Sequence, residues 1–144
     1  MDELGNFIKR VSDQCTSREM DIAAHYRLTL SESRAIRSFR SPDEKIKMTE
    51  LSNRMELAES RITRIIDSLV KKKYIVRENS AEDRRVVFIG LTEKGRSVFS
   101  ELLETCDQLW RQIWKLLPDE VKGSIINDFR ILDQVMDQIK GINP

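Results

Sequence analysis

Apolar residues return every three or four positions through the first 24 residues, the spacing of one helix face. They are Leu4, Phe7, Ile8, Val11, Cys15, Ile22 and Ala23. Charged and amide residues lie between them, so the pattern predicts an amphipathic helix over residues 4–24. A shorter helix is expected next, with Ser31 as its N-cap and Pro42 beyond its end. A polar loop with one bridging pair near Ile46 should follow it.

The best-defined helical pattern lies between residues 59 and 71. Its buried side is predicted from a stripe at i, i+3, i+4, i+7 and i+8, formed by Ile62, Ile65, Ile66, Leu69 and Val70. At 100° per residue the opposite side carries Ser60, Arg64, Asp67 and Lys71, flanked by Arg61 and Thr63. A preceding helix, capped by Thr49 and ending near Met55, should be joined to it by a tight connection at residues 56–58.

Two β-type runs follow, residues 74–78 and 86–91, both rich in β-branched or aromatic side chains. The turn-rich segment 79–85 between them predicts a hairpin with a charged tip. Thr92 fits the N-cap of a long helix with an apolar repeat to Leu117, and Pro118 begins another that Gly141 ends. These helices carry more apolar surface than a small domain needs for itself, which predicts self-association.

Composition excludes several classes of protein. Charged residues make up 34% of the 144 residues and aromatic residues 6%, a balance typical of soluble helical chains of about one domain. No apolar run approaches the roughly 18 residues that span a bilayer, and the N-terminus lacks a signal-peptide core, so we expect a cytoplasmic protein. Two cysteines outside any metal-binding spacing and a single histidine predict neither an enzyme nor a metal or cofactor.

The charge is unevenly distributed along the chain. Residues 1–47, 48–96 and 97–144 carry +1, +3 and −3, although the whole chain carries only +1. Between residues 61 and 77 of the middle stretch, Asp67 is the sole acidic residue among six cations, namely Arg61, Arg64, Lys71, Lys72, Lys73 and Arg77, which gives a local +5. Basic residues are therefore concentrated on and after the helix predicted at residues 59–71.

Helix, turn, helix and hairpin, in this order, describe a mainly α fold with a small β-wing. In a helix-turn-helix the second helix enters the major groove of DNA, with its N-terminal residues over base edges. Arg61 and Arg64 can each offer two donors to guanine or phosphate, and Ser60 and Thr63 can donate to phosphate oxygens. Lys71, Lys72 and Lys73 supply point charges. The alternative interpretation is a helix with an ordinary solvated basic face.

The hairpin tip adds a second candidate contact with DNA. Asp83 stands two residues before Arg85, so it can pair with that guanidinium and hold it extended toward a narrow minor groove, beside Arg84. A surface ion pair is the simpler alternative.

The sequence of the middle stretch resembles the winged helix-turn-helix of MarR-type bacterial transcription regulators. The resemblance rests on residues 51–77, on Glu82-Asp83-Arg84-Arg85 and on Leu91-Thr92-Glu93-Lys94-Gly95. It implies a homodimeric repressor on a pseudo-palindromic duplex. It also implies a single domain over residues 1–144, with dimerisation helices at 1–30 and 97–144 and the DNA-binding region at 31–96. Ser60, Arg61, Thr63 and Arg64 then contact the groove or phosphates, and Asp83 and Arg85 form the wing pair.

The chain departs from the family pattern at three positions. Glu56, Ala58 and Lys73 stand where the family usually has glycine, a serine cap and glycine. A left-handed Lys73 costs about 1 kcal/mol relative to glycine, and Ala58 forgoes a cap worth ~1 kcal/mol.

Sensing is a further implication of the resemblance. Members of the family commonly respond to small aromatic ligands between the dimer helices and the winged domain, where His25, Tyr26 and Trp110 are candidate lining residues; core packing is the alternative for each. Other members respond through an oxidised cysteine, for which Cys15 is the candidate. Cys15 and Cys106 lie on apolar stripes, so buried structural thiols are the alternative. A winged module that binds protein instead of DNA is a further hypothesis, motivated by the near-neutral total charge.

Overall fold

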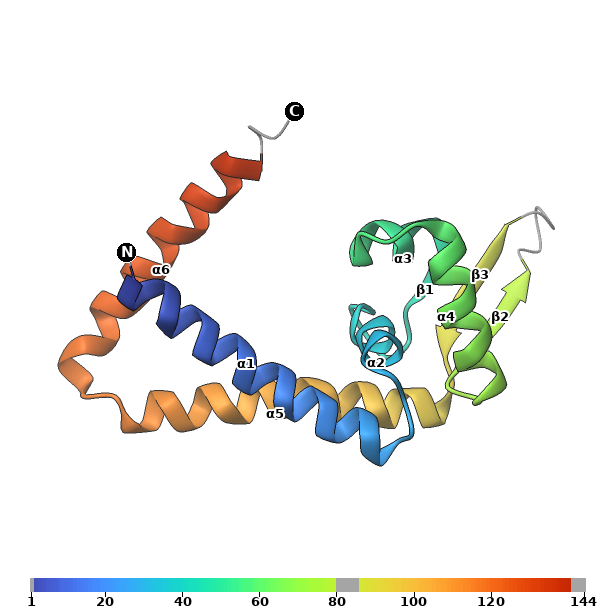
Figure 1. Ribbon diagram of the computed structural model, residues 1–144, viewed down its shortest axis with the longest axis horizontal. Coiled ribbons are helices and arrows are strands. Elements are labelled where there is room, and N and C mark those ends of the chain that lie inside the picture. The colour runs from blue at the N-terminus through green and yellow to red at the C-terminus, as the bar shows by residue number, and fades with distance from the viewer. Residues whose placement is uncertain (1, 80–85, 141–144) are drawn as a thin grey trace. The chain divides into compact units, whose positions relative to one another are not determined.

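The order of elements confirms a mainly α fold with a small β-wing (Figure 1). The computed structural model describes residues 2–79 and 86–140, and the chain forms two compact units, Met1–Cys106 and Asp107–Pro144. The first unit contains α1 (Asp2–His25), α2 (Leu30–Arg37), β1 (Lys45–Lys47), α3 (Met48–Met55), α4 (Glu59–Lys71), β2 (Ile75–Asn79), β3 (Val87–Leu91) and the start of α5 (Glu93–Leu116). The second contains the remainder of α5, and α6 (Asp119–Lys140).

Helix α2 is capped by Thr29, so the prediction of Ser31 as its N-cap was wrong. The Thr29 hydroxyl accepts a hydrogen bond from the Glu32 N–H at 3.2 Å, and the Glu32 carboxylate accepts one from the Thr29 N–H at 2.6 Å. This reciprocal capping box satisfies two backbone donors at once, whereas a lone serine satisfies one. The helix therefore begins at Leu30, and Ser31 lies inside its first turn.

The first helix of the helix-turn-helix begins without a side-chain cap. Lys47, the last residue of β1, is extended with φ −75° and ψ 152° and already occupies the N-cap position of α3. The prediction of Thr49 as the cap was wrong because the strand runs straight into the helix, which leaves Thr49 within the first turn. Ala58 precedes α4 and likewise makes no side-chain cap hydrogen bond.

The sheet is antiparallel, with strand order β1-β3-β2. The hairpin predicted at residues 74–78 and 86–91 is present as β2 and β3, each beginning one residue later. The bridging pair expected near Ile46 is a three-residue strand in which Ile46 lies opposite Ile89. Ile75 lies opposite Leu91 in the other pairing, and all four side chains are buried. The sheet therefore contributes one apolar face to the core.

Helices α2, α3 and α4, the sheet and the start of α5 share one hydrophobic core. Its fully buried side chains include Ala35, Ile36, Leu51, Ile62, Ile66, Leu69, Ile75, Ile89 and Val98. Val70, predicted to be part of the buried stripe of α4, is only partly buried against this core. The core fixes α4 from one side and leaves its other side toward solvent.

Three non-glycine residues adopt a left-handed backbone conformation where helices end. They are Arg27, Glu56 and Lys73, with φ values of 53°, 52° and 64°. Glu56 and Lys73 stand at the two positions where the family usually has glycine, and Lys73 has the left-handed conformation for which a cost was expected. Each such residue costs about 1 kcal/mol relative to glycine. Tertiary contacts must offset that cost.

The second unit carries a long row of solvent-exposed apolar side chains on α6. Their exposed fractions lie between 43% and 53%, and the residues are Ile126, Phe129, Ile131, Leu132, Val135, Met136 and Ile139. Pro118 separates α6 from α5, and its carbonyl accepts a hydrogen bond from the Val121 N–H at 3.2 Å. Apolar exposure of this extent on one helix indicates a surface that a partner covers.

Candidate nucleic-acid interface

Helix α4 has one buried apolar face and one exposed polar face. Ile62, Ile65, Ile66 and Leu69 are each at most 9% exposed. Ser60, Arg61, Thr63, Arg64 and Lys71, the predicted contact residues of this helix, are all exposed. The Thr63 hydroxyl donates to the Glu59 carbonyl one turn earlier at 2.9 Å. The division of the helix predicted from its 3,4 repeat is therefore confirmed, and its polar face is accessible to a partner.

Two of the six cations counted in the local +5 are held by carboxylates. Arg77 on β2 lies 2.7 Å from Asp67 on α4, the acidic residue already counted within the local +5. Lys72 lies 2.7 Å from Glu32, a residue of α2 outside the stretch over which the local +5 was counted. Among residues 2–79 and 86–140, no ion pair is made by Arg61, Arg64, Lys71 or Lys73. These four remain available to an anionic partner.

The turn between α3 and α4 is held by hydrogen bonds to its own backbone. The N–H groups of Glu56 and Leu57 donate to Asn53 and Ser52 at 3.3 and 3.2 Å, and the Ser52 hydroxyl donates to the Leu57 carbonyl. The left-handed backbone conformation of Glu56 permits this tight turn. Helix α4 then begins at Glu59. The tight connection predicted at residues 56–58 is therefore confirmed.

Sequence reasoning missed the residue that braces α3. Arg54 is 15% exposed and donates to both carboxylate oxygens of Glu44 at 2.7 and 2.9 Å, and to the Ser38 carbonyl at 2.8 Å. The hydrogen bond from Arg54 lowers the pKa of Glu44 to about 2. Glu44 and Ser38 precede Arg54 by 10 and 16 residues, a separation at which helical periodicity gives no signal. Arg54 also donates to Glu50, one helical turn earlier.

The wing is described only at its base. Asp83, Arg84 and Arg85, the predicted tip residues, lie outside the described residues. Strands β2 and β3 lead toward them, and β2 is linked to α4 by the Arg77–Asp67 pair.

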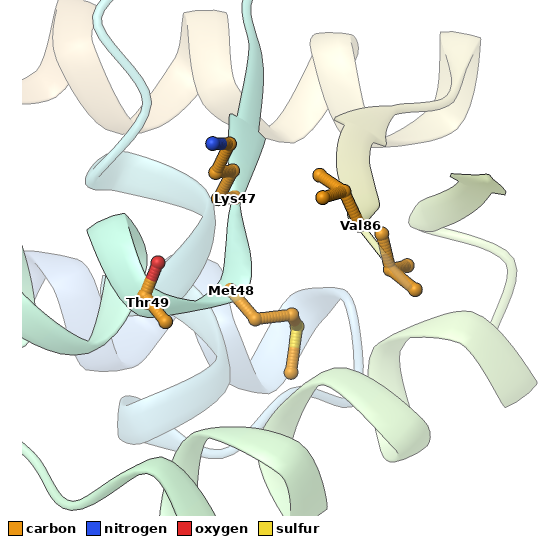
Figure 2. Close-up of a pocket in the computed structure, with 5 residues that line it drawn as sticks. Lys47, Met48, Thr49 and Val86 are labelled. Carbon is orange, nitrogen blue, oxygen red and sulfur yellow. The ribbon is translucent and has the colours of Figure 1, made fainter. Parts of the chain in front are cut away.

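A small apolar hollow of about 290 Å³ lies where β1 meets α3 and the chain enters β3. It is lined by Lys47, Met48, Thr49, Val86 and Val87, and Figure 2 shows the Met48 side chain extended across the space between Thr49 and Val86. Of the lining residues, only Thr49 was given a local role from the sequence, that of a helix cap, and no ligand site was predicted here. Lys47 is the titratable side chain among the described residues that line the hollow.

The residues predicted to line an effector pocket divide between the two units. His25 and Tyr26 lie in the first, with their rings in an edge-to-face contact at 4.9 Å, and Trp110 lies in the second. The Tyr26 hydroxyl donates to the Glu101 carboxylate at 2.6 Å, and this hydrogen bond, with burial, raises the pKa of Tyr26. The tyrosine therefore already has an internal acceptor.

Cys15 is half-buried on α1, and Cys106 lies in α5 with its side chain outside the described ones. In the part of the chain that the structure describes, no cluster of His, Cys, Asp or Glu side chains is arranged to hold a metal ion. Of the described helices, none combines the length and the apolarity that crossing a bilayer requires.

The chain folds as a winged helix-turn-helix whose second helix has an exposed cationic face, an arrangement it shares with MarR-type transcription regulators. A MarR-family protein from Bacillus stearothermophilus has this fold, with a TM-score of 0.76, 25% identity, and 94% of each chain covered. FabT from Streptococcus pneumoniae, solved in complex with DNA, matches with a TM-score of 0.78 at 18% identity, over 96% of this chain and 98% of its own. The fold predicted by the resemblance is therefore confirmed.

The chain belongs to the SarA/Rot family of transcriptional regulators, whose model matches residues 20–102, more than half of the 144. The transcriptional repressor MprA of Escherichia coli is 33% identical over 95 residues, which are 66% of this chain and 54% of MprA. The chain spans at most 62% of the length of two other curated relatives. Because the family consists of transcriptional regulators, the expectation that the chain is not an enzyme is confirmed.

Proposed function

We propose that the chain is a ligand-responsive repressor that binds a pseudo-palindromic duplex as a homodimer, with α4 in the major groove. The observation that carries the proposal is the row of exposed Arg61, Arg64 and Lys71 beside Ser60 and Thr63, opposite a buried apolar face. Guanidinium groups at the start of such a helix reach base edges and phosphates. FabT, which has the same fold, was solved bound to DNA.

The homodimer is supported by apolar surface that the chain leaves exposed. Phe7 and Ile8 on α1 are 43% and 57% exposed, and the apolar row of α6 lies in the same range. We propose that residues 1–30 and 97–144 provide the dimer contact, and that residues 31–96 form the DNA-binding region. Two copies of α4 would then meet half-sites one helical turn apart, about 34 Å.

Repression and ligand response extend the proposal. MprA, which is 33% identical over 66% of this chain, is a repressor, which supports that direction of control. The effector is a small aromatic molecule, and His25, Tyr26 and Trp110 are its proposed contacts. The hydrogen-bonded Tyr26 hydroxyl and Glu101 carboxylate are polar groups with which such a molecule could form hydrogen bonds.

DNA binding by α4 is tested with two arginine variants in a mobility-shift titration on fragments of the promoter of the chain's own gene. We expect Arg64→Ala to weaken binding by about 1 to 3 kcal/mol. Arg111→Ala is the matched control, because Arg111 is 72% exposed on α5 and its ion pair is with the similarly exposed Asp107, one turn away. Equal affinities for wild type, Arg64→Ala and Arg111→Ala would exclude α4 as the contact, and no binding by wild type would exclude the function.

A further inference from the structure

Lys72 differs from its neighbours because its ammonium group is fully occupied inside the protein. A lysine ammonium has three donors. Those of Lys72 meet the two carboxylate oxygens of Glu32 at 2.9 and 2.7 Å and the carbonyl of Arg27 at 3.0 Å. No donor is left for a phosphate. Lys71 and Lys73, which flank it, are exposed and make no ion pair among the described residues.

Glu32 links the beginning of α2 to the end of α4. The carboxylate is 3% exposed, and besides Lys72 it accepts hydrogen bonds from the Ser68 hydroxyl at 2.5 Å and the Thr29 N–H at 2.6 Å. Burial acts to raise the pKa of Glu32, but the hydrogen bonds from Lys72, Ser68 and Thr29 outweigh it, so the pKa lies below its ordinary value. The carboxylate is therefore charged at neutral pH, with all its partners in place.

The same region also holds the end of α1. Helix α1 ends at His25, and the carbonyls of the next two residues, Tyr26 and Arg27, accept hydrogen bonds from Tyr74 and Lys72. The Tyr74 hydroxyl lies 2.9 Å from the Tyr26 carbonyl. Arg27 has a left-handed backbone conformation, with φ 53°. The side chains of Lys72 and Tyr74, just after α4, thus donate hydrogen bonds to the backbone of the two residues that follow α1.

We propose that Glu32 and Lys72 are positioning residues that couple α1 to α4 and thereby set the spacing of half-sites that the dimer accepts. The inference rests on the proposed function, because α1 belongs to the proposed dimer contact and α4 to the proposed DNA contact. A rigid joint presents the two copies of α4 at one separation. A loosened joint lets each α4 reorient, which leaves binding to a single half-site intact and removes the preference for one spacing.

A purely structural role for this ion pair makes a different prediction. If Glu32 and Lys72 only stabilised the fold, their loss would lower the unfolding temperature, while the folded protein would keep its choice of spacing. Spacing preference is therefore the informative readout. It is the ratio of dissociation constants for a duplex with lengthened spacing and one with the selected spacing.

The experiment uses the full chain with Lys72→Gln and Glu32→Gln, and Lys71→Gln as the matched control. Binding by fluorescence anisotropy is measured on three duplexes at several salt concentrations: the site selected by wild type, the same site lengthened by two base pairs, and a single half-site. We expect Lys72→Gln and Glu32→Gln to lower the spacing ratio at least about fivefold, with unchanged half-site affinity and salt dependence. Lys71→Gln should keep the ratio and reduce the slope of log K against log salt by about one.

Retention of the wild-type spacing ratio by Lys72→Gln would overturn the inference while leaving the proposed function in place. A smaller salt slope in Lys72→Gln, as in Lys71→Gln, would also overturn it, because Lys72 would then contact phosphate. Circular dichroism establishes that each variant is folded. If Glu32→Gln is not folded, Lys72→Gln decides the question alone, since its side chain is 33% exposed and its removal leaves Ser68 and Thr29 on the carboxylate. Failure of wild type to bind any duplex would instead overturn the proposed function, and this inference with it.

Discussion

The guanidinium of Arg77 lies 2.7 Å from the carboxylate of Asp67 and joins a strand of the wing to the exposed face of α4. Asp67 is 56% exposed and Arg77 35%, so the pair adds little to stability, at most about 1 kcal/mol. Its position gives it another consequence. Asp67 is a negative charge on a face proposed to meet phosphates, and Arg77 is what neutralises it there.

Removal of the Asp67 charge should therefore strengthen DNA binding. We expect Asp67→Asn to tighten binding by about 1 kcal/mol at low salt and Arg77→Gln to weaken it similarly, with thermal unfolding nearly unchanged in both. Anisotropy titrations with the selected duplex measure the binding affinity of both variants, and calorimetry measures their thermal unfolding. Weaker binding by Asp67→Asn would contradict the proposed orientation of α4.

Gly95 is a position where α5 can approach the chain at the end of α4. A Cβ on Gly95 would lie 2.1 Å from the carbonyl oxygen of Tyr74, which is backbone and cannot move aside cheaply. Thr92 reinforces this approach, because its hydroxyl accepts the Gly95 N–H at 3.1 Å and lies 2.7 Å from the Lys73 carbonyl.

Gly95→Ala should consequently lower the free energy of unfolding by about 1 to 3 kcal/mol through backbone displacement. Gly123→Ala is the control, because a Cβ on Gly123 meets nothing within 4 Å. Inside α6, just past its first turn, that change should be neutral or stabilising by up to about 1 kcal/mol. Urea denaturation distinguishes the two, and equal stability of both variants would show that the Gly95 contact is not essential.

The Glu44–Arg54 pair makes stability depend on pH in the acid range. The hydrogen bond from Arg54 lowers the pKa of Glu44 from 4.5 to about 2. A group with a depressed pKa contributes stability above its unfolded value and loses it as pH falls through the folded value, here between about 4.5 and 2. We expect a loss on the order of 2 kcal/mol across that window, and a smaller loss in Glu44→Gln, measured by urea denaturation at each pH. Parallel pH profiles for the two proteins would contradict this assignment.

Self-association should depend on the apolar row of α6. Leu132→Glu places a charge in that row, whereas Gln134→Glu adds the same charge at a polar position of the same helix. We expect sedimentation equilibrium to show a dimer for wild type and Gln134→Glu and a monomer for Leu132→Glu. A dimer in all three would place the dimer contact elsewhere.

Periodicity predicted the helices of this chain well, because the spacing of apolar residues in an amphipathic helix identifies the face that is buried. The stripe from Ile62 to Leu69 is the clearest case, and Thr92 was also predicted correctly as a cap. The T-x-x-E box at Thr29 was visible in the sequence and indicated the start of α2 better than Ser31 did.

Contacts between distant residues could not be predicted in the same way. Lys72 was counted as a groove-facing cation, yet its partner Glu32 stands 40 residues earlier and is brought to it only by the packing of α2 against α4. Arg54 and Glu44 belong to the same class. Pairing of this kind depends on tertiary structure. Some charged residues that a count along the sequence assigns to the binding surface are therefore paired inside the folded protein.

Selection of bound sites from a pool of random duplexes, with the wild-type protein, tests the central claim most directly. We predict a motif with two-fold symmetry whose half-site centres lie about one helical turn, ~34 Å, apart, and whose enrichment is lost in Arg61→Ala/Arg64→Ala. Absence of any enriched duplex, or a motif that the double variant selects equally well, would contradict the account.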